Sequence, residues 1–237
     1  TTPGRILFGL DAVDQVGVEA AALGAKKALL VCTPSAIRHG VAGKIKDLLS
    51  KEGVSSYIYD RIGPDPDTAI VDQCTESACS IACDLVIGVG GGSALDVAKG
   101  VALTAKNGEK FNEFLKQKTN PRSVLPKILI PTTSGSGSEV SQAAVFVDKQ
   151  SGTKSGLHLR CLLADTAIVD PRLVLTLPAA PTADGGLDSF IHSIEAIYST
   201  TATLMSDSVA YRACRQIWDY LPVVFKVGTD INARQQV

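Results

Sequence analysis

The sequence predicts an α/β protein, with a Rossmann-like parallel sheet followed by the beginning of an all-helical domain. Short apolar runs alternate with helical segments of 12 or more residues, which is the pattern of βαβ units. One apolar run, residues 84–90, ends in consecutive glycines and leads directly into a helical segment. After about residue 178 the pattern changes to helices alone, so we predict domains at 1–177 and 178–237.

The elements before the glycines follow from the apolar runs and the residues that interrupt them. The loop 63–67 contains two prolines, which break regular structure. We expect strands at 5–8, 27–32, 54–59 and 84–90, and helices at 11–23, 35–52 and 68–82.

The elements after the glycines are expected in two groups. The first comprises helix 93–105, strand 127–130, and short strands within 142–170 with turns at 150–152 and Gly156. The second comprises helices at 182–199 and 203–220, and another that begins near Asp230. Because the sequence stops at Val237 inside an expected helix, we predict that the helical domain is incomplete.

The composition excludes several classes of protein. With 237 residues, 45% of them hydrophobic and 20% charged, the chain reads as an ordinary soluble domain. A net charge of −1 argues against nucleic acid or an anionic membrane as a partner, and the apolar runs are too short to span a bilayer.

The six cysteines form no CxxC pair and follow no secretory segment, which favours a reducing, cytoplasmic location. Cys79 and Cys83 stand four apart. We interpret them as small buried helix residues, with a metal pair as the alternative.

The glycine turn, residues 90–99 (GGGSALDVAK), has the features of a phosphate site. Glycines let a ligand approach the backbone, and the helix N-terminus offers free N–H groups and partial positive charge. Ser93 and Asp96 are expected to form a capping-box pair at this helix start. A tight, capped turn without a ligand is the alternative, and the ordinary GxGxxG fingerprint is not met.

Asp188 and His192 stand four residues apart on an expected helix, so both side chains can reach one ion. A catalytic metal normally needs three or four protein ligands, which makes this pair half of a site. We interpret the other two histidines, His39 and His158, as structural.

Several segments together resemble the iron-containing (group III) alcohol dehydrogenases across the whole chain. These segments are residues 90–99, 131–139 (PTTSGSGSE), Lys154, 167–171 (AIVDP) and 186–195 (GLDSFIHSIE). The resemblance implies that Asp188 and His192 are two of four metal ligands for Fe²⁺, with Zn²⁺ as an alternative. It implies cofactor-binding roles for Thr33, Asp65, Gly91, Gly92, Ser93, Ala94, Thr132, Thr133, Ser136 and Lys154.

The resemblance also implies a function: NAD(P)-dependent, metal-dependent hydride transfer between an alcohol and its aldehyde or ketone, in a cytoplasmic homo-oligomer. Thr33 stands where family members often carry a carboxylate that binds the adenosine 2′-hydroxyl, so NAD and NADP both remain possible. Arg38 lies nearby, although a surface role for it is the simpler interpretation. The alternatives are a dinucleotide-binding fragment without turnover and a glycerol dehydrogenase-like relative.

Overall fold

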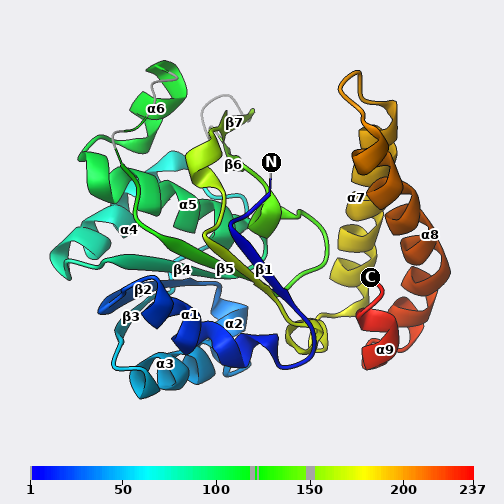
Figure 1. Ribbon diagram of the computed structural model, residues 1–237, viewed down its shortest axis with the longest axis horizontal. Helices are drawn as coiled ribbons and strands as arrows, with labels where there is room; N and C mark the ends of the chain where they lie inside the picture. The colour runs from blue at the N-terminus through cyan, green and yellow to red at the C-terminus, as the bar shows by residue number, and fades with distance from the viewer. Residues whose placement is uncertain (1, 118–120, 122, 148–152) are drawn as a thin grey trace. The chain divides into compact units, whose positions relative to one another are not determined.

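A six-stranded parallel sheet forms the centre of the first part of the molecule (Figure 1). The structure is a computed structural model that describes residues 2–117, 121, 123–147 and 153–237. The strand order is β1-β8-β5-β4-β2-β3, and all neighbouring strands run parallel. The strands are β1 (Arg5–Phe8), β2 (Lys27–Cys32), β3 (Ser55–Tyr59), β4 (Leu85–Gly90), β5 (Lys127–Pro131) and β8 (Thr166–Val169).

Helices cover both faces of this sheet, which explains why its strands read as continuous apolar runs. Every residue of β4 and β5 is buried. One face carries η1 (Ala12–Gln15), α1 (Val16–Ala22), α2 (Pro34–Arg38) and α3 (Val41–Lys51) (Figure 1). The other face carries α4 (Thr68–Ser80) and α5 (Gly92–Asn107) (Figure 1).

The expected α/β fold class is therefore confirmed, and most expected strands lie within a residue or two of the observed ones. The expected helix 35–52 is wrong in one respect, because it is divided into α2 and α3. Gly40 separates them with a φ of 75°, a left-handed conformation that ends one helix before the next begins.

A two-stranded antiparallel hairpin follows the sheet strands, formed by β6 (Ala143–Val147) and β7 (Lys154–His158). The expected turn at Gly156 is wrong, since this glycine lies within β7. The expected turn at 150–152 lies outside the described residues. Sequence reading missed α6 (Phe111–Gln117), whose Phe111 and Phe114 are buried in the core. After β5 the chain also forms three short 3-10 helices within the described residues: η2 (Ser138–Val140), η3 (Arg160–Leu162) and η4 (Pro171–Val174).

The last part of the chain is helical, with α7 (Ala179–Tyr198), α8 (Leu204–Lys226) and α9 (Ile231–Arg234). The expected end of the second helix at residue 220 is wrong, because α8 continues through Pro222 to Lys226. The buried guanidinium of Arg234 fastens α9 in this unit. It donates to the hydroxyl of Thr182 at 2.9 Å and to the carbonyl oxygens of Leu177 and Gly228.

Internal contacts divide the chain into two compact units. The first comprises Thr1–Pro131 with Ser138–Asp170, and the second comprises Thr132–Gly137 with Pro171–Val237. None of the helices within the described residues is both long and apolar enough to cross a membrane.

All six cysteines lie in the described residues and are free thiols. Cys32 and Cys74 are buried, but the expectation that Cys79 and Cys83 are buried helix residues is wrong. Cys79 is exposed on α4, and Cys83 is half-buried beyond the end of that helix.

Candidate functional site

The sheet has a topological switch point between β2 and β4, and the glycine turn lies there. The chain continues from β2 to β3 in one direction, then returns past β2 to β4 and continues to β5 in the other. In open α/β sheets, ligands bind in the crevice at the carboxyl ends of the strands that flank such a point. Thr33 follows β2 and Gly90 ends β4, so both stand at this crevice.

Position 90 requires a glycine because of its backbone conformation and because there is no space for a side chain. Its φ of 153° is one that side-chain-bearing residues rarely adopt, and a Cβ added there would lie 2.5 Å from Cγ2 of Thr33. Thr33 itself caps α2, since its hydroxyl accepts a hydrogen bond from the Ala36 N–H at 3.3 Å. The backbone of the turn and the side chain of Thr33 are therefore packed tightly against each other.

A small pocket of about 150 Å³ lies beside the start of α5. It brings together four of the predicted cofactor-binding residues, namely Asp65, Gly92, Ser93 and Lys154. Its other lining residues are Pro66, Asp96, Val145, Phe146 and Val147. Of the remaining predicted residues, Ala94 is buried in the first turn of α5, and Gly91 is the residue that precedes the helix.

Lys154 and Asp65 form an ion pair across this pocket, with Nζ 3.1 Å from Oδ1 and both side chains largely exposed. Asp65 has a φ of 45°, a left-handed conformation that aspartate adopts more readily than most residues. The neighbouring backbone is tied to the hairpin, because the Val147 N–H donates to the Pro66 carbonyl oxygen at 3.0 Å. The loop after β3 and the hairpin thus both line one small pocket and are joined by a hydrogen bond.

The capping-box expectation for Ser93 and Asp96 is wrong. Gly91 occupies the N-cap position of α5, and no side chain caps this helix. The Asp96 carboxylate instead accepts from the Ser138 hydroxyl at 2.6 Å and from the Val145 N–H at 3.0 Å. The N-terminus of α5 consequently keeps its partial positive charge available for a ligand rather than for a neighbouring carboxylate.

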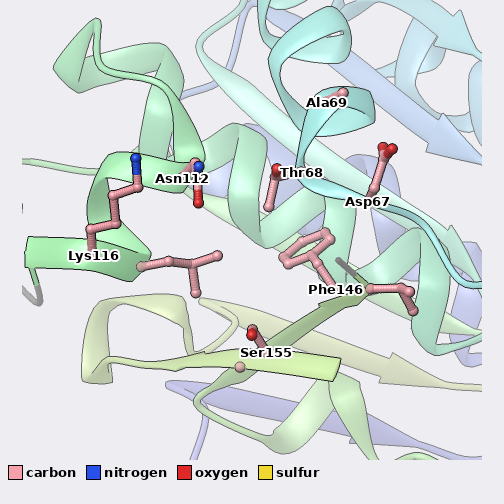
Figure 2. A pocket seen from close by; sticks show the side chains of 10 residues that line it. Asp67, Thr68, Ala69, Asn112, Lys116, Phe146 and Ser155 are labelled. Atoms are coloured by element: carbon pink, nitrogen blue, oxygen red, sulfur yellow. The ribbon is translucent and has the colours of Figure 1, made fainter. Parts of the chain in front are cut away.

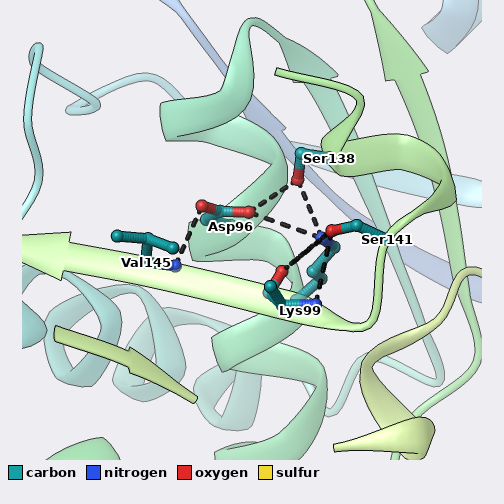
Figure 3. Close-up of polar contacts among 6 residues, drawn as sticks. Asp96, Lys99, Ser138, Ser141 and Val145 are labelled. Atoms are coloured by element: carbon teal, nitrogen blue, oxygen red, sulfur yellow. Dashed lines mark hydrogen bonds and ion pairs between the residues drawn. The ribbon is translucent and has the colours of Figure 1, made fainter. Parts of the chain in front are cut away.

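Lys99 is a feature of this region that sequence reading missed. Its ammonium is fully buried and lies within 3.4 Å of oxygen atoms of Asp96, Ser138, Ser141 and Ala143 (Figure 3). Burial lowers the pKa of the Lys99 ammonium, while Asp96 and Glu139 oppose that shift. The signal in the sequence was a single charged residue within the otherwise apolar stretch 97–103 (VAKGVAL) of this helix.

A second, larger pocket of about 700 Å³ shares Phe146 and Val147 with the small one. Asp67 at the start of α4, Lys116 on α6 and Ser155 on β7 line it from different elements (Figure 2). None of its lining residues was predicted from the sequence.

The loop 132–137, which contains the predicted cofactor-binding residues Thr132, Thr133 and Ser136, packs against α7 within the second unit. The Ser189 hydroxyl donates to the Gly135 carbonyl oxygen at 3.0 Å. A Cβ added at Gly185 would lie 2.5 Å from the Ser134 carbonyl oxygen, so the helix and the loop are in close backbone contact.

The predicted metal pair lies on α7, where Nε2 of His192 is 3.6 Å from Oδ1 of Asp188 and both side chains are about half exposed. Within the described ranges, no group of three or more His, Cys, Asp or Glu residues is placed to hold an ion. His39 lies on the other unit, where its Nδ1 is 2.9 Å from the carbonyl oxygen of Ser35. His158 lies on β7.

Two family models match almost the whole chain. The model for iron-containing alcohol dehydrogenases matches residues 3–171, and the model for the C-terminal part of that family matches residues 182–237. The chain belongs to the iron-containing alcohol dehydrogenase family.

Individual relatives agree with this assignment. The chain is 38% identical to long-chain-alcohol dehydrogenase 1 of Geobacillus thermodenitrificans, covering 97% of this chain and 60% of the relative. It is 33% identical to the NAD-dependent methanol dehydrogenase of Bacillus methanolicus, over 98% of this chain and 61% of that one. The crystal structure of sulfoacetaldehyde reductase from Bifidobacterium kashiwanohense in complex with NAD⁺ matches with a TM-score of 0.94 at 30% identity. This match covers 100% of the present chain and 62% of the crystallised one.

The chain therefore spans about 60% of the length of these relatives. The family membership and the fold apply to the present chain directly. The activity of the longer relatives does not transfer in the same way.

Proposed function

We propose that this chain is the dinucleotide-binding part of an NAD(P)-dependent alcohol dehydrogenase, together with the first residues of its metal-binding domain. The reaction would be hydride transfer between a nicotinamide cofactor and the carbon of an alcohol or its aldehyde or ketone. The observation that carries the proposal is the small pocket at the switch point, where Gly92, Ser93, Asp65 and Lys154 converge.

The residues of this pocket fit a dinucleotide. The uncapped N-terminus of α5 offers amide donors and partial positive charge to a pyrophosphate. The glycine at position 90 keeps the backbone open where a side chain would collide with Thr33. Lys154 would donate to ribose or phosphate oxygens, and Asp65 would accept from a ribose hydroxyl.

The cofactor is proposed to be NAD, with NADP also accepted. Thr33 carries no charge, so it would not repel a 2′-phosphate as a carboxylate at the same place would. The relatives reported above include an NAD-dependent enzyme and an NAD⁺ complex, which favours NAD.

For the metal, the proposal extends to two ligands only. The family name implies iron, and Asp188 and His192 are donors of types that Fe²⁺ and Zn²⁺ accept. Two half-exposed donors do not make a catalytic metal centre, since such centres use three or four. The residues that the structure describes therefore do not fit a complete metal site, and this chain alone is not expected to oxidise alcohols. Because these residues do not complete a metal site, a dinucleotide-binding fragment without turnover is the second candidate function.

We also propose that residues 1–177 form the dinucleotide-binding domain and that residues 178–237 belong to the metal-binding domain. Free thiols at all six described cysteines fit the cytoplasm. The exposed apolar side chains Ile6 and Phe8 on the edge strand β1 favour a homo-oligomer, which light scattering would test.

Calorimetric titration of the chain with NAD and with NADP tests the central proposal. Lys154→Met removes the cation of the small pocket, and we expect it to weaken cofactor binding about tenfold, or about 1.4 kcal/mol. Lys116→Met is the matched control, because Lys116 is an exposed lysine of the larger pocket only. A folded chain that binds neither cofactor at millimolar concentration contradicts the proposal. An NAD(P)H-linked assay with short-chain alcohols separates the two candidates.

A further inference from the structure

Lys99 is the most deeply buried charged side chain near the small pocket, with none of its side chain exposed. A buried ammonium is costly unless hydrogen-bond acceptors surround it. Its Nζ lies 2.6 Å from the Ala143 carbonyl oxygen, 2.8 Å from the Ser138 hydroxyl and 3.3 Å from the Ser141 hydroxyl (Figure 3). One side chain of α5 thereby holds η2, the turn after it and the first residue of β6.

Asp96 extends this network to the pocket. Its Oδ1 lies 3.4 Å from the Lys99 ammonium and accepts from the Ser138 hydroxyl at 2.6 Å. Its Oδ2 accepts from the backbone N–H of Val145 at 3.0 Å. Asp96 and Val145 both line the small pocket together with Gly92 and Ser93. The carboxylate therefore links the first turns of α5 directly to the β6 wall of that pocket.

We propose that Lys99 is a positioning residue for the dinucleotide site: its ammonium fixes the Asp96 carboxylate and the start of β6, and these set the width of the pocket beside Gly92 and Ser93. This inference rests on the proposed cofactor binding. Lys99 touches no ligand in this arrangement and acts through Asp96 and Ala143. Without the ammonium, the Asp96 carboxylate loses its cation, and β6 loses a bond to its Ala143 carbonyl oxygen.

The protein contains a matched control in Lys127. It is also buried and also pairs with an aspartate, with Nζ 3.5 Å from Oδ2 of Asp165. Lys127 begins β5, whereas the glycine turn follows the end of β4, its parallel neighbour. Lys127 therefore lies at the opposite end of the parallel strands from the glycine turn, and it is not among the residues that line the small pocket.

The test compares Lys99→Met and Lys127→Met in the full 237-residue chain. Thermal unfolding measures stability, and calorimetry measures the Kd for NAD at a temperature where each variant is folded. We expect both variants to melt at lower temperature, because each leaves an aspartate without its cation. Only Lys99→Met should also weaken NAD binding, by about tenfold or more, or about 1.4 kcal/mol.

A second variant keeps the inference testable if Lys99→Met does not fold. Ser141→Ala removes one acceptor of the ammonium, a half-buried hydroxyl, and should weaken NAD binding about threefold, or roughly 0.7 kcal/mol. An unchanged Kd in Lys99→Met, or in Ser141→Ala where only that variant folds, overturns the inference while the proposed function stands. An equal loss of affinity in Lys127→Met overturns it as well, because the effect would then be general destabilisation. If the unsubstituted chain binds no NAD, the proposed function fails and the inference fails with it.

Discussion

The two units of the molecule differ in how firmly they hold their candidate functional residues. In the α/β unit, β4 and β5 are buried along their whole length, and the glycine turn lies between packed elements. In the helical unit, α7 and α8 bury few residues, and large apolar side chains such as Leu204, Met205 and Trp218 are more than 70% exposed. A functional geometry is precise where packing locks the side chains. The glycine turn meets that condition, whereas the exposed side chains of Asp65 and Lys154 and the half-exposed Asp188–His192 pair do not.

The largest effect should come from Gly90, where close packing coincides with a backbone conformation that residues with side chains rarely adopt. In Gly90→Ala, the Cβ would meet Thr33 Cγ2 at 2.5 Å and Ala94 Cβ at 2.9 Å, in a backbone conformation that alanine rarely adopts. We expect a loss of roughly 2–4 kcal/mol in the free energy of unfolding, measured by urea denaturation.

Gly43→Ala is the matched control for this change, because a Cβ there meets nothing within 4 Å and the residue lies in α3. It should leave the stability unchanged or raise it by up to about 1 kcal/mol. Equal urea midpoints for the two variants would show that the turn can open to admit a side chain.

Because two thiols of the α/β unit are buried, we expect the protein to lose stability at alkaline pH. Burial, assisted by Asp60, raises the pKa of Cys32 from 9.0 to about 12, and burial also raises the pKa of Cys74. The unfolded chain loses these protons above about pH 9 and the folded chain keeps them. The contribution of these thiols to the free energy of unfolding is therefore complete below about pH 9. It declines as pH rises further, by up to about 1.4 kcal/mol per pH unit for each thiol.

Urea titrations between pH 8 and about pH 10.5 would measure this slope. The double variant Cys32→Ala with Cys74→Ala should show a clearly shallower decline. Lys99 and Lys127 act in the opposite direction, since burial lowers the pKa of each, so the comparison with the unsubstituted chain isolates the thiols. Cys79→Ala, at an exposed position of the same helix as Cys74, is the control for removing a thiol that is not buried.

The single tryptophan reports on the exposed face of the helical unit. Trp218 is 71% exposed, and its ring centroid is 6.3 Å from that of Phe190. Its fluorescence should be quenched by iodide almost as strongly in the folded chain as in urea. Protection that increases with protein concentration would show that a second copy covers this face, which would remove the contrast between the two units.

The same difference in packing explains what the sequence could predict of the fold. Strands buried on both faces read as apolar runs, so β2, β4 and β5 were recognisable from local pattern. Helix boundaries that depend on single residues were harder to predict from the sequence. The break at Gly40 and the continuation of α8 through Pro222 depend on tertiary context that overrides local preference.

For the site, local spacing identified the glycine turn, because a strand, glycines and a helix start are adjacent in the sequence. The Asp96 network was not predictable in this way. Asp96 bonds Ser138 and Val145, which are 42 and 49 residues away, and a nearby serine offered a simpler capping partner. Contacts of that separation appear only once the chain is folded.

The smallest effect on stability should come from the metal pair itself. His192→Ala removes an exposed contact with Asp188, and such surface pairs contribute at most about 0.5 kcal/mol. Its consequence should appear instead in metal binding. With two donors, the chain should hold Zn²⁺ or Fe²⁺ weakly and exchange it readily, and His192→Ala should abolish that weak binding while the Kd for NAD stays unchanged. Equilibrium dialysis with Zn²⁺ measures this, with His39→Ala as the control because His39 lies on the other unit. Tight, stoichiometric zinc that survives His192→Ala would mean that the ligands lie elsewhere in the chain.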